Sequence, residues 1–182
     1  MIINGHNVYI RPGFRPKKNW AVFLDRDGVI NKEKKFAFKL KDLVLVPEII
    51  PALKRLNQQQ ITVIVVHNAA AAARNLCRLE DVEKFNRHLI NKLLGKNVFI
   101  DALFYCPHHP TAFNPQYKKD CSWHKPGSGM LTAAAKKFRL DLSLSFLIGD
   151  QERDIEAART AGVTAYLINH GQDILNAVDK II

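Results

Sequence analysis

The chain has 182 residues, 47% of them hydrophobic, which is enough for one globular domain with a full core but too little for a second complete domain. No apolar run reaches the roughly 18 residues of a membrane span, so we expect no membrane partner. The formal net charge of +10 would suit an anionic partner. Its basic clusters are dispersed and lack interleaved aromatic residues, so they are more simply solvated surface, and nucleic acid is a weaker candidate than a small phosphorylated molecule.

The three cysteines, Cys77, Cys106 and Cys121, are an odd and sparse set for a disulfide scaffold. They indicate either a reducing compartment or metal binding. The amino terminus is mixed polar and basic rather than a charged head followed by an apolar block, which argues against a secretion signal. We expect a soluble cytoplasmic protein, and a monomer.

Residues 1–19 contain several glycine and proline residues and are predicted to be an irregular basic lead-in, with at most an edge segment at its end. Residues 20–182 are predicted to form a single domain. The hydrophobic pattern of this part predicts strands and helices in alternation. The predicted strands are residues 20–24, 61–66, 101–105, 144–148 and 163–168, with a short extended piece at 43–46, and the predicted helices are 47–57, 69–73, 80–94, 127–138, 154–161 and 172–181.

This alternation is typical of an α/β fold with a doubly wound parallel sheet. The carboxyl ends of parallel strands meet at one edge of such a sheet, and that edge is where ligands bind. We therefore expect the polar side chains near these ends to converge on one rim. They are Asp25, Asp27, His67, Asn68, Lys125 and Asp150.

Asp25 and Asp27 directly follow the first predicted strand and precede Gly28. In an extended segment residues i and i+2 point the same way, so both carboxylates could reach one cleft, where their repulsion calls for a cation or a shared proton. Mg²⁺ is the simplest answer, because it binds a few carboxylates and completes its shell with water and substrate phosphate. One carboxylate could then attack phosphorus while the other handles protons. For Asp-x-Asp-Gly alone, a turn with two solvated aspartates is the alternative.

With these points in order, the sequence resembles the haloacid dehalogenase (HAD) superfamily of phosphotransferases. It is most similar there to the phosphatases acting on D-glycero-D-manno-heptose 1,7-bisphosphate and histidinol phosphate. The most specific motif is Tyr-Cys-Pro-His-His-Pro at residues 105–110, followed by Cys121 and by Lys-Pro at 125–126. Leu-Asp-Arg-Asp-Gly-Val-Ile-Asn at 24–31 and Gly-Asp-x3-Asp-Ile-x-Ala-Ala at 149–158 support it. The resemblance implies a HAD-like fold without a large cap domain.

The resemblance also implies roles for individual residues. Asp25 would be the nucleophile that forms an aspartyl-phosphate. Asp27 would act as acid and base, and its backbone carbonyl would contact a Mg²⁺ ion also held by Asp25 and Asp150. Lys125 would neutralise the phosphoryl group and the nucleophile, and Asn68 would lie beside the substrate. Phosphoryl transfer needs such positioning and charge neutralisation more than elaborate covalent chemistry.

The residues expected around the substrate depart from the family pattern at several positions. His67 stands where the family has a hydroxyl residue that binds a phosphate oxygen, and an imidazole N–H can also donate. The segment 69–71 is three alanines where the family has Gln-x-Gly. His124 stands where the family has an arginine that binds substrate, and Gln151 stands where the family has a lysine. The catalytic residues are therefore retained while the residues expected to read the substrate are changed.

The Cys/His loop at 106–125 matches the zinc pattern of the subgroup in part. Cys106, His108 and Cys121 correspond to three zinc ligands, but the position of the fourth holds Trp123, whose indole cannot bind zinc. Zn²⁺ is therefore a second candidate cofactor beside Mg²⁺. The candidates for the missing ligand are His109, His124 and water, and the loop without metal is the alternative.

The sequence supports three hypotheses of function. The first is an active Mg²⁺-dependent phosphatase that acts on a small phosphorylated metabolite, with a heptose or other sugar phosphate as the best candidate. The second is a catalytically impaired relative that acts as a binding or regulatory protein, because the segment after His67 is altered. The third and weakest, suggested by the positive charge, is a phosphatase of nucleic-acid ends.

Overall fold

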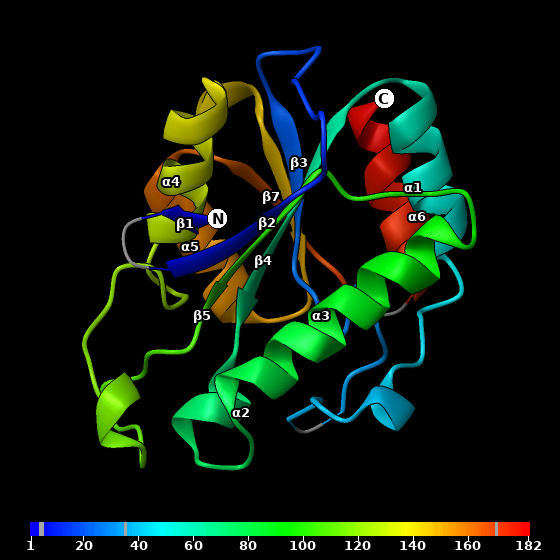
Figure 1. The fold of residues 1–182 in the computed structure, drawn as a ribbon. Helices are drawn as coiled ribbons and strands as arrows, with labels where there is room; N and C mark the ends of the chain where they lie inside the picture. The colour runs from blue at the N-terminus through cyan, green and yellow to red at the C-terminus, as the bar shows by residue number, and fades with distance from the viewer. Residues whose placement is uncertain (4–5, 35, 170) are drawn as a thin grey trace.

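A computed structural model describes residues 1–3, 6–34, 36–169 and 171–182 (Figure 1). Its centre is a seven-stranded sheet in the order β1-β2-β5-β4-β3-β6-β7. The strands are β1 (Ile2–Ile3), β2 (His6–Ile10), β3 (Ala21–Leu24), β4 (Thr62–Asn68), β5 (Ala102–Cys106), β6 (Phe146–Gly149) and β7 (Thr164–Leu167).

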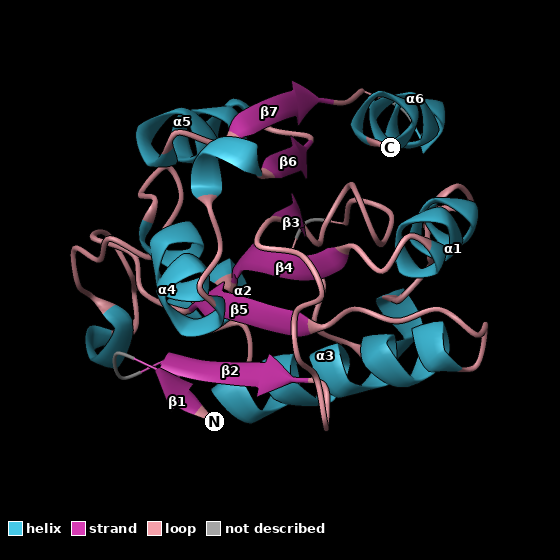
Figure 2. Ribbon diagram, turned by 90° about the horizontal axis from the view of Figure 1, so that it is seen from above, coloured by secondary structure: helices cyan, strands magenta, loops and turns pink. Residues whose placement is uncertain are grey.

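Helices cover both faces of this sheet (Figure 2). One face packs against α1, α3 and α6 and the other against α4 and α5, while the single turn α2 follows β4 directly. The helices are α1 (Ile49–Gln58), α2 (Ala70–Ala73), α3 (Leu79–Leu94), α4 (Gly129–Phe138), α5 (Glu152–Ala161) and α6 (Gly171–Ile181). The predicted α/β doubly wound architecture is confirmed.

The central strand β3 shows how the apolar sequence produces these layers. All four of its residues are buried, and successive side chains point to opposite faces. Val22 and Leu24 join the core under α1, α3 and α6, whereas Ala21 and Phe23 join the core under α4 and α5. A strand buried on both faces must be apolar throughout, which explains why its first polar side chain is the aspartate at its carboxyl end.

Five neighbouring strands, in the spatial order β5-β4-β3-β6-β7, are parallel. In this order β3 lies between β4 and β6. From β3 the chain proceeds outward through β4 and β5, and then returns to the other side of β3 to form β6 and β7. The carboxyl ends of β3 and β6 therefore flank the point where the strand order reverses. In open α/β sheets this point is the ligand-binding crevice.

The amino-terminal residues are more regular than the predicted irregular lead-in. β2 pairs antiparallel with β5, with Val8 opposite Phe104, and β1 pairs antiparallel with β2. Arg11 extends this attachment, because its guanidinium lies 2.8 Å from the carboxylate of Asp101, just before β5. The expectation for residues 1–19 is corrected here, because half-buried strand residues at a sheet edge carry a weaker sequence signal than fully buried ones.

No large cap is inserted among the described residues between β3 and β4, where the chain forms only loops, a short 3-10 helix at Leu40–Asp42 and α1. Lys35, within one basic cluster, lies outside the described residues. In the described ranges no helix has the length and apolar character needed to cross a membrane.

Candidate active site

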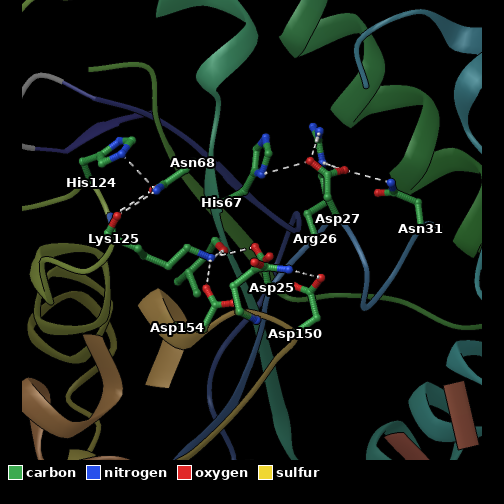
Figure 3. Close-up of polar contacts among 12 residues, drawn as sticks. Asp25, Arg26, Asp27, Asn31, His67, Asn68, His124, Lys125, Asp150 and Asp154 are labelled. Atoms are coloured by element: carbon green, nitrogen blue, oxygen red, sulfur yellow. Dashed lines mark hydrogen bonds and ion pairs between the residues drawn. The ribbon is translucent and has the colours of Figure 1, made fainter. Parts of the chain in front are cut away.

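The carboxyl ends of the central strands bring an aspartate and a lysine into direct contact. Asp25, the first residue after β3, is only 3% exposed, and its Oδ1 accepts a hydrogen bond of 2.7 Å from Nζ of Lys125. Lys125 is equally buried and comes from the loop before α4. Its ammonium also donates to the carbonyl of Val66 at 3.0 Å and lies 2.6 Å from Oδ1 of Asp154 (Figure 3). The predicted proximity of Asp25 and Lys125 is thus a feature of the structure.

Asp154 holds Lys125 from the opposite side and was given no role in the sequence analysis. It is fully buried in the first turn of α5, where its Oδ2 accepts a hydrogen bond of 3.1 Å from the backbone N–H of Gln151. A Cβ on Gly149 would lie 2.4 Å from that of Asp154, so glycine is required for this approach. The signal for Asp154 was its place in the Gly-Asp-x3-Asp motif.

The carboxylates around Lys125 outnumber the cations, so the charge balance favours a bound cation. Asp25, Asp150 and Asp154 form one group whose ligand atoms lie within 4.8 Å of one another, and Lys125 is the ammonium paired with two of them. Oδ1 of Asp150 is buried and has no hydrogen-bond partner among the described residues, while its Oδ2 accepts from Gln151. Three carboxylates against one ammonium, with an unpartnered buried oxygen, fit a divalent cation such as Mg²⁺.

The titration of this group follows from its burial. Burial raises the pKa of Asp25 to about 7, although the ammonium of Lys125 opposes the shift. Burial alone would lower the pKa of Lys125, but Asp25 and Asp154 outweigh it and raise that pKa above its usual value. Burial also raises the pKa of Asp150. A bound cation would favour the ionised form of these carboxyls, because it supplies the positive charge that burial denies them.

Asp27 points away from the acidic group. Its carboxylate accepts hydrogen bonds of 3.1 and 2.9 Å from the guanidinium of Arg26 and one of 2.8 Å from the amide of Asn31. Burial would raise the pKa of Asp27, but the guanidinium of Arg26 and the hydrogen bonds from Arg26 and Asn31 lower it to about 2. Its side chain therefore takes no part in the cluster of Asp25, Asp150 and Asp154.

The turn after β3 depends on Gly28. This glycine has a positive φ of 84°, and a Cβ there would lie 2.1 Å from Oδ2 of Asp150. A side chain at this position would therefore be strained and would displace the carboxylate that follows β6.

Arg26 itself is a buried cation that the sequence analysis gave no role. It is 1% exposed, donates to Asn86 on α3 at 2.9 Å, and lies over the ring of Phe85. These contacts and the carboxylate of Asp27 compensate its charge.

The residues at the end of β4 lie beside this centre. Nδ1 of His67 is 3.7 Å from Oδ2 of Asp27, and burial lowers the pKa of His67 well below its usual value, so the imidazole is neutral at pH 7. Asn68 makes a two-way contact of 3.0 Å with the backbone N–H and carbonyl of Lys125, and Nδ2 of Asn68 is 3.3 Å from Nε2 of His124. Asn68 thus fixes the Lys125 loop on the sheet, and His124 lies beside it.

These residues line a cleft of about 310 Å³. Its floor includes Asp25, Asp27 and Lys125, and one side is the alanine segment 69–71. Besides the carboxylates, the cleft is lined by basic and imidazole side chains. They are Lys34, Arg74, His109, His124 and Arg153. A ligand with one phosphoryl group at Asp25 and further oxygen atoms toward the rim fits this distribution.

The Cys/His loop forms a second cluster, apart from the cleft. Sγ of Cys106 lies 3.8 Å from both Nδ1 of His108 and Sγ of Cys121, so the three predicted ligands are together. The fourth member is His6 of β2. Two candidates for the missing ligand, His109 and His124, are not members of this cluster. Their rings pack on each other and line the cleft, and Nδ1 of His109 accepts a hydrogen bond from the N–H of Thr111. Trp123 is buried against Phe104.

At the switch point of this open, mostly parallel sheet lie a buried aspartate, a lysine and a group of three carboxylates that could hold a cation, an arrangement that can bind and neutralise a phosphoryl group. Residues 122–179 match the family described as HAD-hydrolase-like. The chain is 36% identical over 163 residues to a D-glycero-alpha-D-manno-heptose-1,7-bisphosphate 7-phosphatase from Photorhabdus laumondii, covering 89% of each. It is 34% identical over 155 residues to the beta-named enzyme of that organism, covering 85% of this chain and 82% of the relative.

Among solved structures, the D,D-heptose 1,7-bisphosphate phosphatase of B. bronchiseptica, complexed with magnesium and phosphate, superposes with a TM-score of 0.76 at 28% identity. The match covers 88% of this chain and 87% of that one. The chain belongs to the HAD superfamily of phosphatases, in the subgroup of the heptose-1,7-bisphosphate 7-phosphatases.

Proposed function

We propose that this phosphatase is a Mg²⁺-dependent phosphomonoesterase of a small phosphorylated sugar and acts through an aspartyl-phosphate on Asp25. The observation that carries the proposal is the ammonium of Lys125 between Asp25 and Asp154, next to an unpartnered carboxylate oxygen of Asp150. Asp25 and Asp150 would hold the metal, with Asp154 nearby. When bound, Mg²⁺ would neutralise charge on the phosphoryl oxygens and orient them.

The proposed reaction has two steps. A carboxylate oxygen of Asp25 attacks phosphorus, the bond from phosphorus to the sugar oxygen breaks, and the sugar oxygen takes up a proton. Water then loses a proton and attacks the phosphorus of the aspartyl-phosphate, which releases inorganic phosphate and restores Asp25. Lys125, whose ammonium contacts Asp25 in the structure, would balance the charge of the phosphoryl group.

Asp27 is the residue proposed to supply and accept these protons. The side chain is bound to Arg26 and Asn31, so its carboxylate must turn from them toward the substrate and take up a proton. The low pKa in the present position keeps Asp27 ionised until it turns. This requirement makes the movement of Asp27 a part of the proposed mechanism.

The rim supports a substrate with a second anionic group. Lys34, Arg74 and Arg153 lie around the cleft, and its volume of about 310 Å³ is at the lower end for a small-molecule site. The relatives named above are phosphatases of a heptose bisphosphate, which carries phosphate at both ends. A heptose 1,7-bisphosphate is therefore the first substrate to test.

A second candidate function is favoured by one observation. Asp27 is bound by Arg26 and Asn31 and lies near the neutral His67, so the chain could bind phosphorylated sugars without efficient turnover. Both functions share the same cleft and differ in whether a bond to phosphorus breaks.

Steady-state assays with Mg²⁺ test the proposal. The substrates are the two anomers of heptose 1,7-bisphosphate, histidinol phosphate and 3′-phosphorylated DNA. We expect turnover of a sugar phosphate that disappears in Asp25→Asn and persists in Asp179→Asn, a matched change on the exposed face of α6. Equal rates for wild type and Asp25→Asn on every substrate would refute catalysis. Calorimetric binding of the bisphosphate without turnover would support the binding function.

A further inference from the structure

Four metal-binding side chains meet where the amino-terminal strand reaches the Cys/His loop. They come from separate places: His6 from β2, Cys106 from the end of β5, His108 from the residues that follow, and Cys121 from the far end of the loop. His6 and Cys106 are buried and the other two are partly buried. One ligand atom of each lies within 4.8 Å of all the others.

The distances match those of a tetrahedral zinc site. With Zn–S bonds of about 2.3 Å and Zn–N bonds of about 2.0–2.1 Å, a tetrahedron places two sulfur atoms about 3.8 Å apart and a sulfur and a nitrogen about 3.6 Å apart. Here the two Sγ atoms are 3.8 Å apart. Nδ1 of His108 is 3.8 Å from Sγ of Cys106, and Nε2 of His6 is 3.5 Å from Sγ of Cys121.

Sheet register places His6 in this group. Val8 pairs with Phe104 and Ile10 with Ala102, so each residue back along β2 moves one residue forward along β5. Two residues before Val8, His6 therefore lies opposite Cys106, two residues after Phe104. Directly opposite residues in an antiparallel pair have side chains on the same face, so the imidazole of His6 faces the thiol.

The position of Trp123 is consistent with a fourth zinc ligand that comes from β2 and not from the loop. It occupies the position at which the subgroup has a second cysteine near Cys121, and its indole is 3% exposed. The ring of His6 packs on that indole with centroids 4.1 Å apart. Trp123 therefore removes one donor and at the same time forms a wall that holds the imidazole toward the two sulfur atoms.

We propose that His6, Cys106, His108 and Cys121 bind a structural zinc ion, with His6 of β2 replacing the ligand that the loop lacks. Two thiolates and two imidazoles form a complete tetrahedral set with no position left for substrate or water, which is the pattern of structural zinc. The chemistry of the donors excludes Mg²⁺, which prefers oxygen ligands.

The proposed ion joins the amino terminus to the loop that serves the cleft. His124 N–H donates to the carbonyl of Cys121 at 2.9 Å, and Lys125 follows immediately. His109 directly follows the ligand His108 and lines the cleft. Zinc would therefore fix both ends of the loop relative to β2. Metal binding at this cluster is independent of the proposed function.

Metal content and spectroscopy of the full chain provide the test. The chain is expressed with zinc, purified under reducing conditions and analysed by mass spectrometry, and zinc is then exchanged for Co²⁺. We expect about one zinc per chain, and a cobalt spectrum with thiolate charge-transfer bands and the strong d–d bands of tetrahedral coordination. X-ray absorption of the zinc protein should count two sulfur atoms and two imidazole rings. Absence of zinc and of a cobalt spectrum would overturn the proposal.

Variants distinguish the contribution of His6. His6→Gln keeps the length and polarity of the side chain but offers a poor zinc ligand, so zinc affinity in competition with a chelator should fall at least about tenfold. His88→Gln, on the exposed face of α3, is the matched control and should bind zinc as wild type does. Cys121→Ser should not bind zinc. A chelator, which should lower the Tm of wild type, should therefore leave the Tm of this variant unchanged.

If His6→Gln has wild-type affinity and spectrum, His6 is not a ligand and the proposal is wrong. If that variant does not fold, the imidazole count of the wild-type zinc protein decides: two rings support the proposal, and one overturns it. A Cys106–Cys121 disulfide in the freshly purified protein would also overturn it, because the oxidised sulfur atoms cannot both bind the metal.

Discussion

The guanidinium of Arg26 donates two hydrogen bonds to the carboxylate of the next residue, Asp27, at 3.1 and 2.9 Å. This pairing holds the proposed proton donor in its ionised form and turns it from the nucleophile. The sequence Asp-Arg-Asp therefore contains both carboxylates of the proposed mechanism and the cation that restrains one of them. The proposed mechanism requires that the pairing with Arg26 break when substrate binds.

The role of Asp27 can be tested with leaving groups of different acidity. Asp27→Asn should lower kcat for a sugar phosphate by about 10²-fold or more, because the sugar oxygen leaves only with a proton. With p-nitrophenyl phosphate, whose leaving group needs no proton, we expect a burst of p-nitrophenol followed by slow hydrolysis of the aspartyl-phosphate. Equal losses with both substrates and no burst would contradict the assignment.

Asp154 should stabilise the fold as well as hold Lys125. Asp154→Asn keeps an acceptor for the N–H of Gln151 but removes the charge 2.6 Å from the ammonium. Because Lys125 retains Asp25, we expect a loss of roughly 2 kcal/mol in the free energy of unfolding, less than for a fully broken buried pair. Urea denaturation measures it. Asp179→Asn removes an exposed pair with Arg55 and should change stability little, so equal effects would contradict the prediction.

Mg²⁺ affinity should increase with pH through neutrality. The pKa of Asp25 is raised to about 7 by burial, so below that pH the metal must displace a proton, and above it the carboxylate is already ionised. From pH 6 to pH 8 the ionised fraction, and with it the affinity, should rise about tenfold. Calorimetric titration with Mg²⁺ checks this. In Asp25→Asn binding should be weaker and should lose this step, so a step that persists would assign the titration to another group.

A hydroxyl in place of His67 should improve phosphate binding. Threonine places a donor where the family has one, and a hydrogen bond worth about 1 kcal/mol corresponds to about a fivefold gain in kcat/KM. His67→Val has the same shape as His67→Thr without the hydroxyl and should show no gain. If both variants are less active than wild type by the same factor, the imidazole itself binds the phosphoryl group.

Arg74 should contribute to recognition of a second phosphate. It is exposed at the rim and packs near the ring of Phe36, with 5.1 Å between the guanidinium carbon and the ring centroid. Arg74→Ala should raise KM for a heptose bisphosphate about tenfold and change KM for a monophosphate little. Arg159→Ala, on the exposed surface of α5, is the control. Equal changes for both substrates would argue against this role.

The centre of the fold was predictable because β3, β4 and β5 are buried on both faces. The run at residues 61–66 is β-branched throughout and, apart from Thr62, apolar, and helices with an apolar face follow it in the chain. The same regularity predicted that Asp25, Lys125 and Asp150 converge, since parallel strands end at one edge. Asp25 and Asp150 follow strand ends and depend on topology alone, whereas Lys125 also depends on the loop before α4.

The remaining parts depend on side-chain orientation and on long-range register. The direction of Asp27 is set by the burial of Arg26 against Phe85, which no spacing reveals. His6 reaches the thiols only because β2 pairs antiparallel with β5, and a single histidine near the amino terminus gives no local signal of this pairing. Asp154 belongs to the Gly-Asp-x3-Asp motif, but its contact with Lys125 could be predicted only with the position of the loop before α4.

Three oxygen atoms surround the ammonium of Lys125. It donates hydrogen bonds to Asp25 and to the carbonyl of Val66, and it is ion-paired with Asp154. In the proposed mechanism a phosphoryl oxygen reaches the ammonium as one of these oxygen atoms gives way. The net gain from this lysine in binding a ground-state phosphate is then small, while the more highly charged transition state gains more. The same exchange in reverse gives the lysine a ready partner as phosphate departs, so its pre-existing bonds favour turnover over retention of product.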